Sequence, residues 1–162
     1  MVNEAIQAIR KRLLDVMDPE LPFLNVMEMG MVREIYTDGE GIVIQITPTY
    51  SGCPATDVIA DDVLEAAQSI HEQSRIEIIR SPAWTTDWIT EEAKKKMERN
   101  GIAPPSGQSA DKAYLLGKER VIPCPRCKSA ETLLVSAFGS TACKAHYQCK
   151  HCMEPFDHFK CI

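Results

Sequence analysis

The sequence lacks the long hydrophobic runs that membrane-spanning proteins need. No apolar stretch approaches the roughly 20 residues that cross a bilayer. Hydrophobic residues make up 44% and charged residues 25% of the 162 residues, as in an ordinary soluble globular protein. Met1–Arg12 is polar and amphipathic, without the apolar centre or cleavage pattern of a signal peptide. We therefore expect a cytoplasmic protein that does not associate with a membrane.

Two catalytic signatures are also absent from the sequence. It has no Gly-x-Gly-x-x-Gly fingerprint, which argues against the dinucleotide-binding fold of a reductase. It has no pair of Glu-x-x-His motifs, which argues against a di-iron carboxylate centre on long helices. Aromatic residues make up only 6% and the net charge is -5, which argues against nucleic-acid binding.

Charge is unevenly distributed along the chain. Residues 118–162 carry 7 Lys and Arg against 4 Asp and Glu, although the whole chain has 18 against 23. An acidic N-terminal part is therefore followed by a basic tail, which favours two modules and leaves docking of the tail on an acidic partner open.

The seven cysteines are also unevenly placed. Cys53 stands alone, and the other six lie between Cys124 and Cys161. An odd count without an export signal argues against a disulfide framework and for a reducing compartment. Clustered cysteines in that setting indicate metal or redox chemistry.

Two C-x2-C pairs dominate the tail, Cys124–Cys127 and Cys149–Cys152, with 21 residues between them. Each pair can form a tight knuckle, and two knuckles can complete a tetrahedral four-sulfur site. The segment is short, so a bound metal would have to stabilise it. We predict zinc, while a rubredoxin-like iron site uses the same ligands and stays open. Cys143 and Cys161 are left over, either as packing residues or as ligands of a second metal.

The order of elements predicts an α+β protein. Helical spacing indicates a helix over Asn3–Met17, and alternation indicates strands over residues 31–36, 42–46 and 75–80. A second helix follows Pro54 and a third follows Thr90. The expected buried residues of the second helix are Ile59, Val63, Ala67 and Ile70. We predict a small two-layer α-β-β-α-β-α domain over residues 1–100, a linker over 101–120, and a metal-bound β-ribbon over 121–162.

Cys53 lies in the loop Thr47–Pro54, just before the second predicted helix. Pro54 suits the first helical position. A thiol at a helix start meets free backbone amides and the positive end of the helix dipole, which favour the thiolate. A plain packing cysteine is the alternative, and the residues alone leave both interpretations open.

These residues resemble known families. The Asp18-Pro19-Glu20 loop, the following Gly30-Met31-Val32 stretch and the Cys53 loop resemble the α/β domain of SufT-like iron–sulfur assembly proteins. The whole chain resembles the narrower family of the D subunit, also called J, of the phenylacetyl-CoA ring epoxidase. The further segments that carry this resemblance are Ile102–Pro105, Phe138–Lys144 and Glu154–Cys161.

The resemblance implies a role in aerobic phenylacetate degradation, beside the oxygenase and reductase subunits of a multicomponent epoxidase. It implies that Cys53 is functional, as a carrier of a metal, a transient iron–sulfur cluster or a persulfide, with Asp18, Glu20, Thr49 and Ser51 as motif neighbours. The expected role is accessory and not catalytic, namely maturation or delivery of a metal or iron–sulfur centre. A purely structural role in assembling the complex is the alternative, and a second copy of the chain is a further candidate partner.

Overall fold

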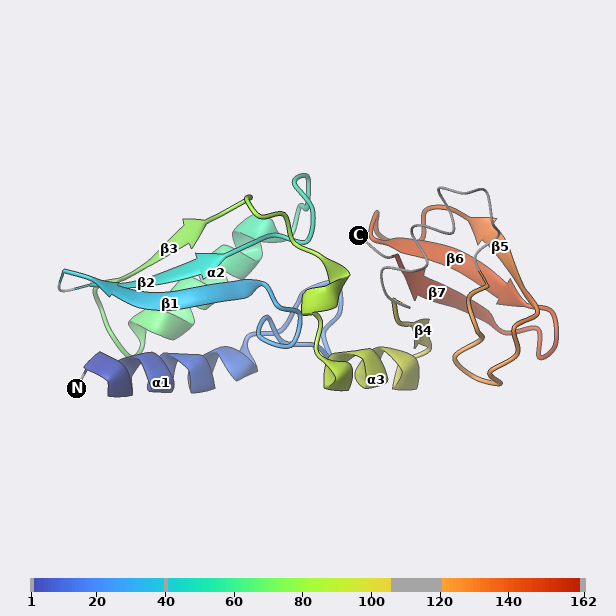
Figure 1. The fold of residues 1–162 in the computed structure, drawn as a ribbon, viewed down its shortest axis with the longest axis horizontal. Helices are drawn as coiled ribbons and strands as arrows, with labels where there is room; N and C mark the ends of the chain where they lie inside the picture. Colours follow the sequence, from blue (N-terminus) through green and yellow to red (C-terminus); the bar gives the residue numbers. More distant parts are fainter. Residues whose placement is uncertain (1, 40, 106–120, 161–162) are drawn as a thin grey trace. The chain divides into compact units, whose positions relative to one another are not determined.

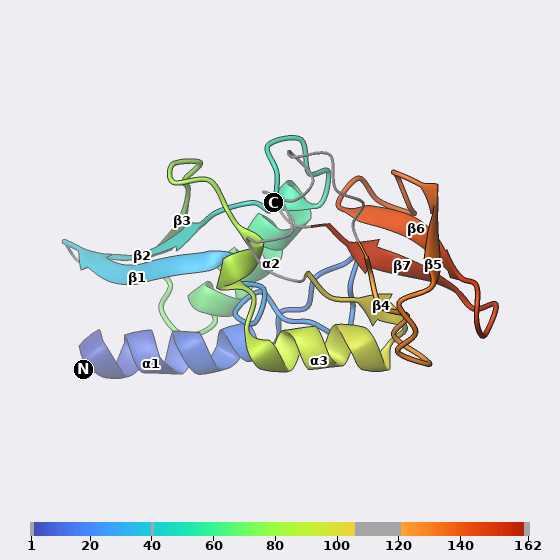
Figure 2. The same cartoon turned by 45° about the vertical axis from the view of Figure 1, so that its right-hand side comes forward.

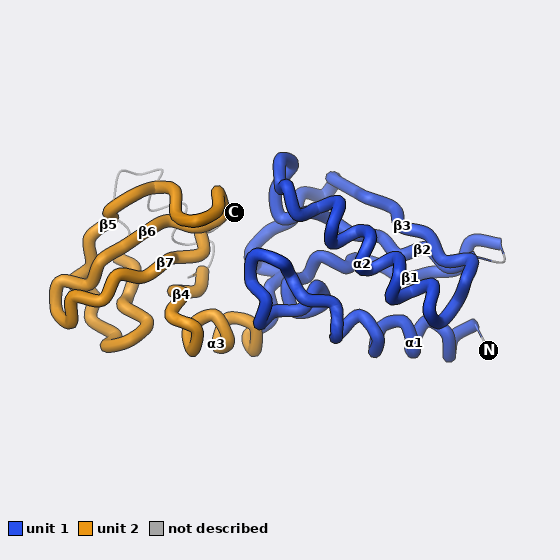
Figure 3. The backbone as a smooth tube through the Cα atoms, turned by 180° about the vertical axis from the view of Figure 1, so that it is seen from behind, with its two compact units in different colours: residues 1–90 blue, residues 91–162 orange. Residues whose placement is uncertain are grey.

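The computed structural model describes residues 2–39, 41–105 and 121–160. The chain divides into two compact units, Met1–Thr90 and Glu91–Ile162 (Figure 3). We call them unit 1 and unit 2 and describe each by itself.

Unit 1 is built on a three-stranded sheet of β1 (Val32–Asp38), β2 (Gly41–Ile46) and β3 (Ser74–Ile78), in the order β1-β2-β3. The hairpin β1–β2 is antiparallel, whereas β2 and β3 are parallel. A parallel pair needs a crossover connection. The helix α2 (Thr56–Gln68) supplies it, so the predicted order of elements is confirmed.

The helices α1 (Val2–Arg12) and α2 lie on one side of this sheet (Figures 1 and 2). A short 3-10 helix, Leu13–Asp15, follows α1, so the predicted helix over Asn3–Met17 ends early. The core of this unit is mostly aliphatic, and three consecutive residues of the central strand β2, Ile42, Val43 and Ile44, are all buried. The fully buried members of the core include Ile9, Leu13, Ile42, Ile44, Ile46 and Ile59. The predicted core residue Ile70 is 43% exposed, because α2 already ends at Gln68.

The end of unit 1 returns to the loop before β1. Trp84 is buried, and its indole Nε1–H donates a hydrogen bond to the carbonyl oxygen of Met29 at 2.9 Å. Gly30 has a φ of +67°, and a Cβ there would lie 2.5 Å from the carbonyl oxygen of Trp88. Only glycine satisfies both constraints. The guanidinium carbon of Arg33 lies 3.4 Å from the centre of the Trp88 ring. Both tryptophans therefore pack the segment after β3 against the loop that leads into β1 and against the start of β1.

Unit 2 begins with α3 (Glu91–Arg99) and the short strand β4 (Ile102–Ala103). Its other strands are β5 (Thr132–Ser136), β6 (Lys144–Cys149) and β7 (Pro155–Phe159), and the sheet order is β4-β7-β6-β5. Part of the predicted linker is thus a strand, because Ile102 and Ala103 pair in parallel with Asp157 and His158. The compact units divide at Thr90, while the domain bounds 1–100 and 121–162 stay a prediction.

The core of the unit 2 sheet is small. Tyr147 on β6 stacks on its cross-strand partner Phe156 on β7, with ring centroids 5.8 Å apart. The same cluster contains two of the cysteines predicted to bind metal, Cys124 and Cys149. Within the described part of the chain, no helix is long and apolar enough to cross a membrane.

Candidate functional site

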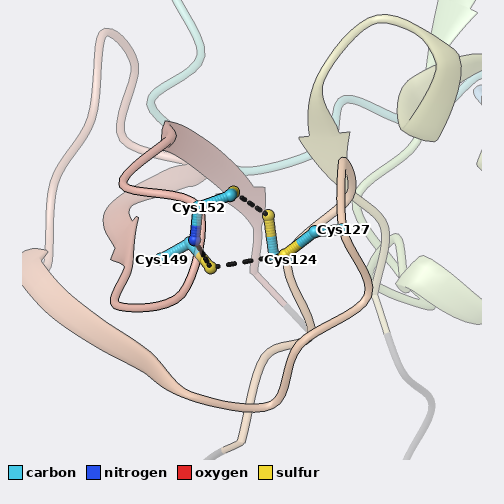
Figure 4. Close-up of side chains that lie close together, drawn as sticks. All are labelled: Cys124, Cys127, Cys149 and Cys152. Carbon is cyan, nitrogen blue, oxygen red and sulfur yellow. Dashed lines mark hydrogen bonds between the residues drawn. The ribbon is translucent and has the colours of Figure 1, made fainter.

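The first knuckle is the turn from Cys124 to Ser129, which precedes β5. The N–H of Lys128 donates to the carbonyl oxygen of Cys124, and the N–H of Cys124 donates to the carbonyl oxygen of Ser129, both at 2.9 Å. These two bonds close the turn, so the side chains of Cys124 and Cys127 are held on one side of it (Figure 4).

The second knuckle repeats this geometry at the end of β6. The N–H of Cys149 donates to the carbonyl oxygen of Glu154 at 2.9 Å, which is the same five-residue span as from Cys124 to Ser129. The residue after the second cysteine has a left-handed backbone in both turns, with φ of 63° at Lys128 and 62° at Met153. Neither position is glycine, so the sequence carries no signal of this conformation.

The four sulfur atoms converge between the knuckles (Figure 4). All lie within 4.8 Å of one another, and two cross-knuckle Sγ–Sγ distances are 3.7 Å for Cys124–Cys152 and 3.6 Å for Cys127–Cys149. A tetrahedral zinc with Zn–S bonds of about 2.3 Å places its sulfur ligands about 3.8 Å apart. The four residues therefore fit a tetrahedral thiolate metal site, which would cross-link the two knuckles.

Backbone hydrogen bonds, burial and neighbouring thiols shift the pKa values of Cys149 and Cys152 in opposite directions. The backbone N–H of Cys152, helped by that of His151, lowers the pKa of Cys149 to about 6 against the opposing effect of burial. The N–H of Glu154 lowers the pKa of Cys152, but burial and the three neighbouring thiols outweigh it and raise this pKa to about 12. Four adjacent thiolates thus need a cation between them, which is what a bound metal supplies.

An ion pair outside the sulfur cluster links the knuckles directly. The guanidinium of Arg126, inside the first knuckle, lies 2.6 Å from a carboxylate oxygen of Glu154, after the second. This pair raises the pKa of Arg126, and the nearby sulfur atoms of Cys152 and Cys124 add to the effect. The guanidinium therefore also offsets part of the negative charge that four thiolates carry.

Of the remaining tail cysteines, Cys143 is not part of this cluster. Cys143 is buried immediately before β6, with its Sγ 3.0 Å from the hydroxyl oxygen of Thr141. Cys161 lies outside the described residues. A second metal bound by Cys143 and Cys161 stays a prediction.

Cys53 occupies a tight corner of unit 1. Its N–H donates to the carbonyl oxygen of Tyr50, and its carbonyl oxygen accepts from the N–H of Thr56, both at 3.2 Å. The helix α2 starts at Thr56 with Ala55 as N-cap, so the expectation that Pro54 is the first helical residue is wrong. Both backbone polar groups of Cys53 are thus hydrogen-bonded within turns. Its thiol is partly exposed, next to the exposed residues Ser51 and Gly52. Cys53 is therefore accessible to a ligand or a partner protein.

The predicted neighbours of Cys53 have local structural roles. The carboxylate of Asp18 is buried and accepts hydrogen bonds from the N–H groups of Glu20 at 2.7 Å and Leu21 at 2.9 Å. Thr49 is buried, and Glu20 is half-buried. Among the described residues, the four tail cysteines are the group of three or more metal-binding side chains that the structure brings together. Cys53 is not part of that group.

Two family models match two different segments of the chain, one containing Cys53 and one containing the four clustered cysteines. Residues 6–78 match the model of the iron–sulfur cluster assembly protein family, and residues 108–160 match the PaaD zinc beta ribbon domain. A protein of Escherichia coli K12, named as the D subunit of 1,2-phenylacetyl-CoA epoxidase, is 47% identical over 93% of this chain and 89% of its own length. The chain belongs to the PaaD family.

Two further comparisons concern the N-terminal part of this PaaD-family chain. An Fe-S protein maturation auxiliary factor of Porphyromonas gingivalis is 33% identical over 57% of this chain and 93% of its own length. The crystal structure of a domain of unknown function, DUF59, from Bacillus anthracis has a TM-score of 0.53 and 23% identity. It covers 59% of this chain and 92% of that one. The structural likeness confirms the predicted fold of the N-terminal part.

Proposed function

We propose that this chain is an accessory subunit of a phenylacetyl-CoA epoxidase that helps a partner subunit acquire its iron–sulfur or metal centre. The observation that carries the proposal is that one chain is similar both to an epoxidase subunit and to an Fe-S maturation factor. Its near-full-length relative is named as an epoxidase subunit, and its N-terminal part is similar to an Fe-S maturation factor. The sequence also lacks the di-iron and dinucleotide motifs that the oxygenase and reductase chemistry needs.

In this proposal the two units divide the work. Cys124, Cys127, Cys149 and Cys152 hold a structural zinc, which fixes the ribbon, and the closed four-ligand set leaves no position for a substrate. Cys53 carries the function: its thiolate is a soft ligand that can hold iron or an iron–sulfur cluster as cargo. The Asp18–Glu20 turn, Thr49 and Ser51 shape the loops of unit 1.

A purely structural role in assembling the epoxidase is the second candidate. It is favoured by one observation, that Asp18 is buried and its Oδ1 accepts two backbone hydrogen bonds within its own loop. In this case the ribbon would bind partners and Cys53 would be a packing residue.

Deletion of this chain from cells that express the other epoxidase components tests the proposal. We expect epoxidase activity to be lost, with the purified oxygenase or reductase present at normal amounts but deficient in iron. The structural alternative predicts normal iron in each component and a failure of the complex to assemble in gel filtration. Full epoxidase activity in the deletion strain would contradict both candidates.

A further inference from the structure

The edge strand β5 differs from the other edge strands of the two sheets. The edge strand β1 carries Arg33, Glu34 and Asp38, and the edge strand β3 carries Arg75 and Glu77. The edge strand β4 is only two residues long. Charged side chains and short length both protect an edge from pairing with another chain. The edge strand β5 (Thr132–Ser136) is five residues long and includes no charge, so its protection is limited to the register irregularity between Leu134 and Ser136.

The β5 strand is also unusually exposed for its composition. Leu133, Leu134 and Val135 are 51%, 49% and 56% exposed, and Phe138 just beyond the strand is 68% exposed. Contiguous apolar side chains on an edge strand mark a surface that pairs with another strand. Within the described residues β5 pairs with β6 alone. A further strand would therefore hydrogen-bond to its outer edge and pack cross-strand side chains against the aliphatic residues on both faces of the sheet.

The two ends of β5 carry opposite charges. The exposed residue Glu131 precedes the strand. At the other end, the ammonium group of Lys160 donates a hydrogen bond to the carbonyl oxygen of Ala137 at 3.1 Å and lies 4.6 Å from the centre of the Phe138 ring. The strand is therefore neutral along its length, negative at its start and positive at its end.

This pattern is self-complementary in the antiparallel sense. In a register centred on Leu134, Thr132 lies opposite Ser136 and Glu131 lies opposite Ala137 of a second copy. The Lys160 ammonium at Ala137 then meets the Glu131 carboxylate, and the two-fold axis creates this ion pair twice. A parallel arrangement would place Glu131 beside its own copy, where like charges repel.

We propose that β5 is a homodimer interface, in which the β5 strands of two copies of this chain pair antiparallel about Leu134. The result is a continuous sheet across two ribbons. The register of β5 against β6 shifts between Leu134 and Ser136, so the pairing of the two copies is irregular on either side of Leu134, and the charges at the strand ends fix its antiparallel direction. Such small interfaces are weak, so the dimer has a dissociation constant of about 1 µM or above.

Sedimentation velocity of the zinc-loaded full chain over a range of concentrations tests the dimer. We expect Leu134→Lys to raise the dimer dissociation constant by about a hundredfold or more, because it places two ammonium groups together at the axis. Glu131→Lys and Lys160→Glu should each raise it by about tenfold, since each change turns two attractive pairs into repulsive ones. The double variant that exchanges both charges should restore a dissociation constant close to that of the wild type.

The matched control is Ile70→Lys, which adds the same charge at a partly exposed apolar residue of unit 1 and should leave the dissociation constant unchanged. A wild-type chain that stays monomeric throughout would overturn the proposal, as would a dimer that Leu134→Lys does not weaken. Failure of the charge exchange to restore association would overturn the antiparallel register. Loss of thermal stability by Leu134→Lys without any change in association would show instead that the strand is covered within its own chain.

Discussion

The two units have different cores. In unit 1 the helices α1 and α2 cover a three-stranded sheet whose buried side chains are almost all aliphatic. The four-stranded sheet of unit 2 instead buries a small cluster that includes Cys124 and Cys149. The first unit can therefore be stabilised by its own hydrophobic core. In the second, a metal held by the four-sulfur site would cross-link the two knuckles. The functional thiol proposed here, Cys53, lies in the unit that does not depend on metal.

Removal of one ribbon thiolate should have the largest effect and should affect only unit 2. We expect Cys127→Ser to lose the bound metal, and with it much of a binding free energy that is about 10–16 kcal/mol in zinc-finger peptides. Unit 2 should then be cleaved by low concentrations of protease while a fragment containing unit 1 persists. Mass spectrometry of the fragments and elemental analysis measure both results, and unchanged metal content with equal protease resistance would refute the site.

The reverse perturbation is a cavity in the core of unit 1. Ile44 is completely buried on the central strand β2, so Ile44→Ala should lower the free energy of unfolding by about 2–5 kcal/mol. The zinc content should stay that of the wild type, because the ribbon has its own cross-link. Denaturant unfolding followed by circular dichroism, with zinc release monitored in parallel, would expose any dependence of the ribbon on this core.

Acidification should weaken metal binding in unit 2. The pKa of Cys149 is lowered to about 6, so this thiol is already ionised at pH 7, whereas the pKa of Cys152 is raised to about 12 and its proton must leave when the metal binds. The affinity should fall as the pH falls, by about tenfold per pH unit for each proton released. Below about pH 6 Cys149 also binds a proton, so the decrease should steepen. Chelator competition at several pH values measures this slope, and a constant slope through pH 6 would be evidence against the acidity of Cys149.

The smallest effect concerns the left-handed backbone of the second knuckle. Met153 is exposed and has a φ of 62°, a conformation that costs a non-glycine residue about 1 kcal/mol. Met153→Gly should therefore stabilise the zinc-loaded ribbon by up to about 1 kcal/mol. Ala130→Gly, at an exposed residue without this conformation, should give no gain. The denaturant midpoint for zinc release compares the two variants, and equal effects would show that the backbone at Met153 is not strained.

The sequence predicts unit 1 better than unit 2 for a physical reason. Alternation and helical spacing report which side chains face a core, so the order of elements around Ile44 and Ile59 follows directly from the pattern. The helix ends are predicted less accurately, since Pro54 suggests a helix start that the backbone delays to Thr56. Helix termini depend on local hydrogen bonds that side-chain periodicity does not report.

In unit 2 the spacing of the cysteines identifies the candidate ligands, but little else about the ribbon follows from its residue pattern. The strand at Ile102 exists only because β7 is available to pair with it. The left-handed backbone at Lys128 and Met153 could not be predicted, because neither position is a glycine. The exposure of the apolar residues of β5 is seen only in the structure.

The most direct test of the division between the two units is complementation of a deletion strain by the Cys53→Ser variant. We predict that this variant keeps its bound zinc and a melting temperature close to that of the wild type but fails to restore epoxidase activity, because the hydroxyl cannot replace a soft sulfur ligand. Val58→Ala, at an exposed position in the first turn of the following helix α2, should restore activity fully. Normal epoxidase activity with Cys53→Ser would contradict the account and leave Cys53 as a packing residue.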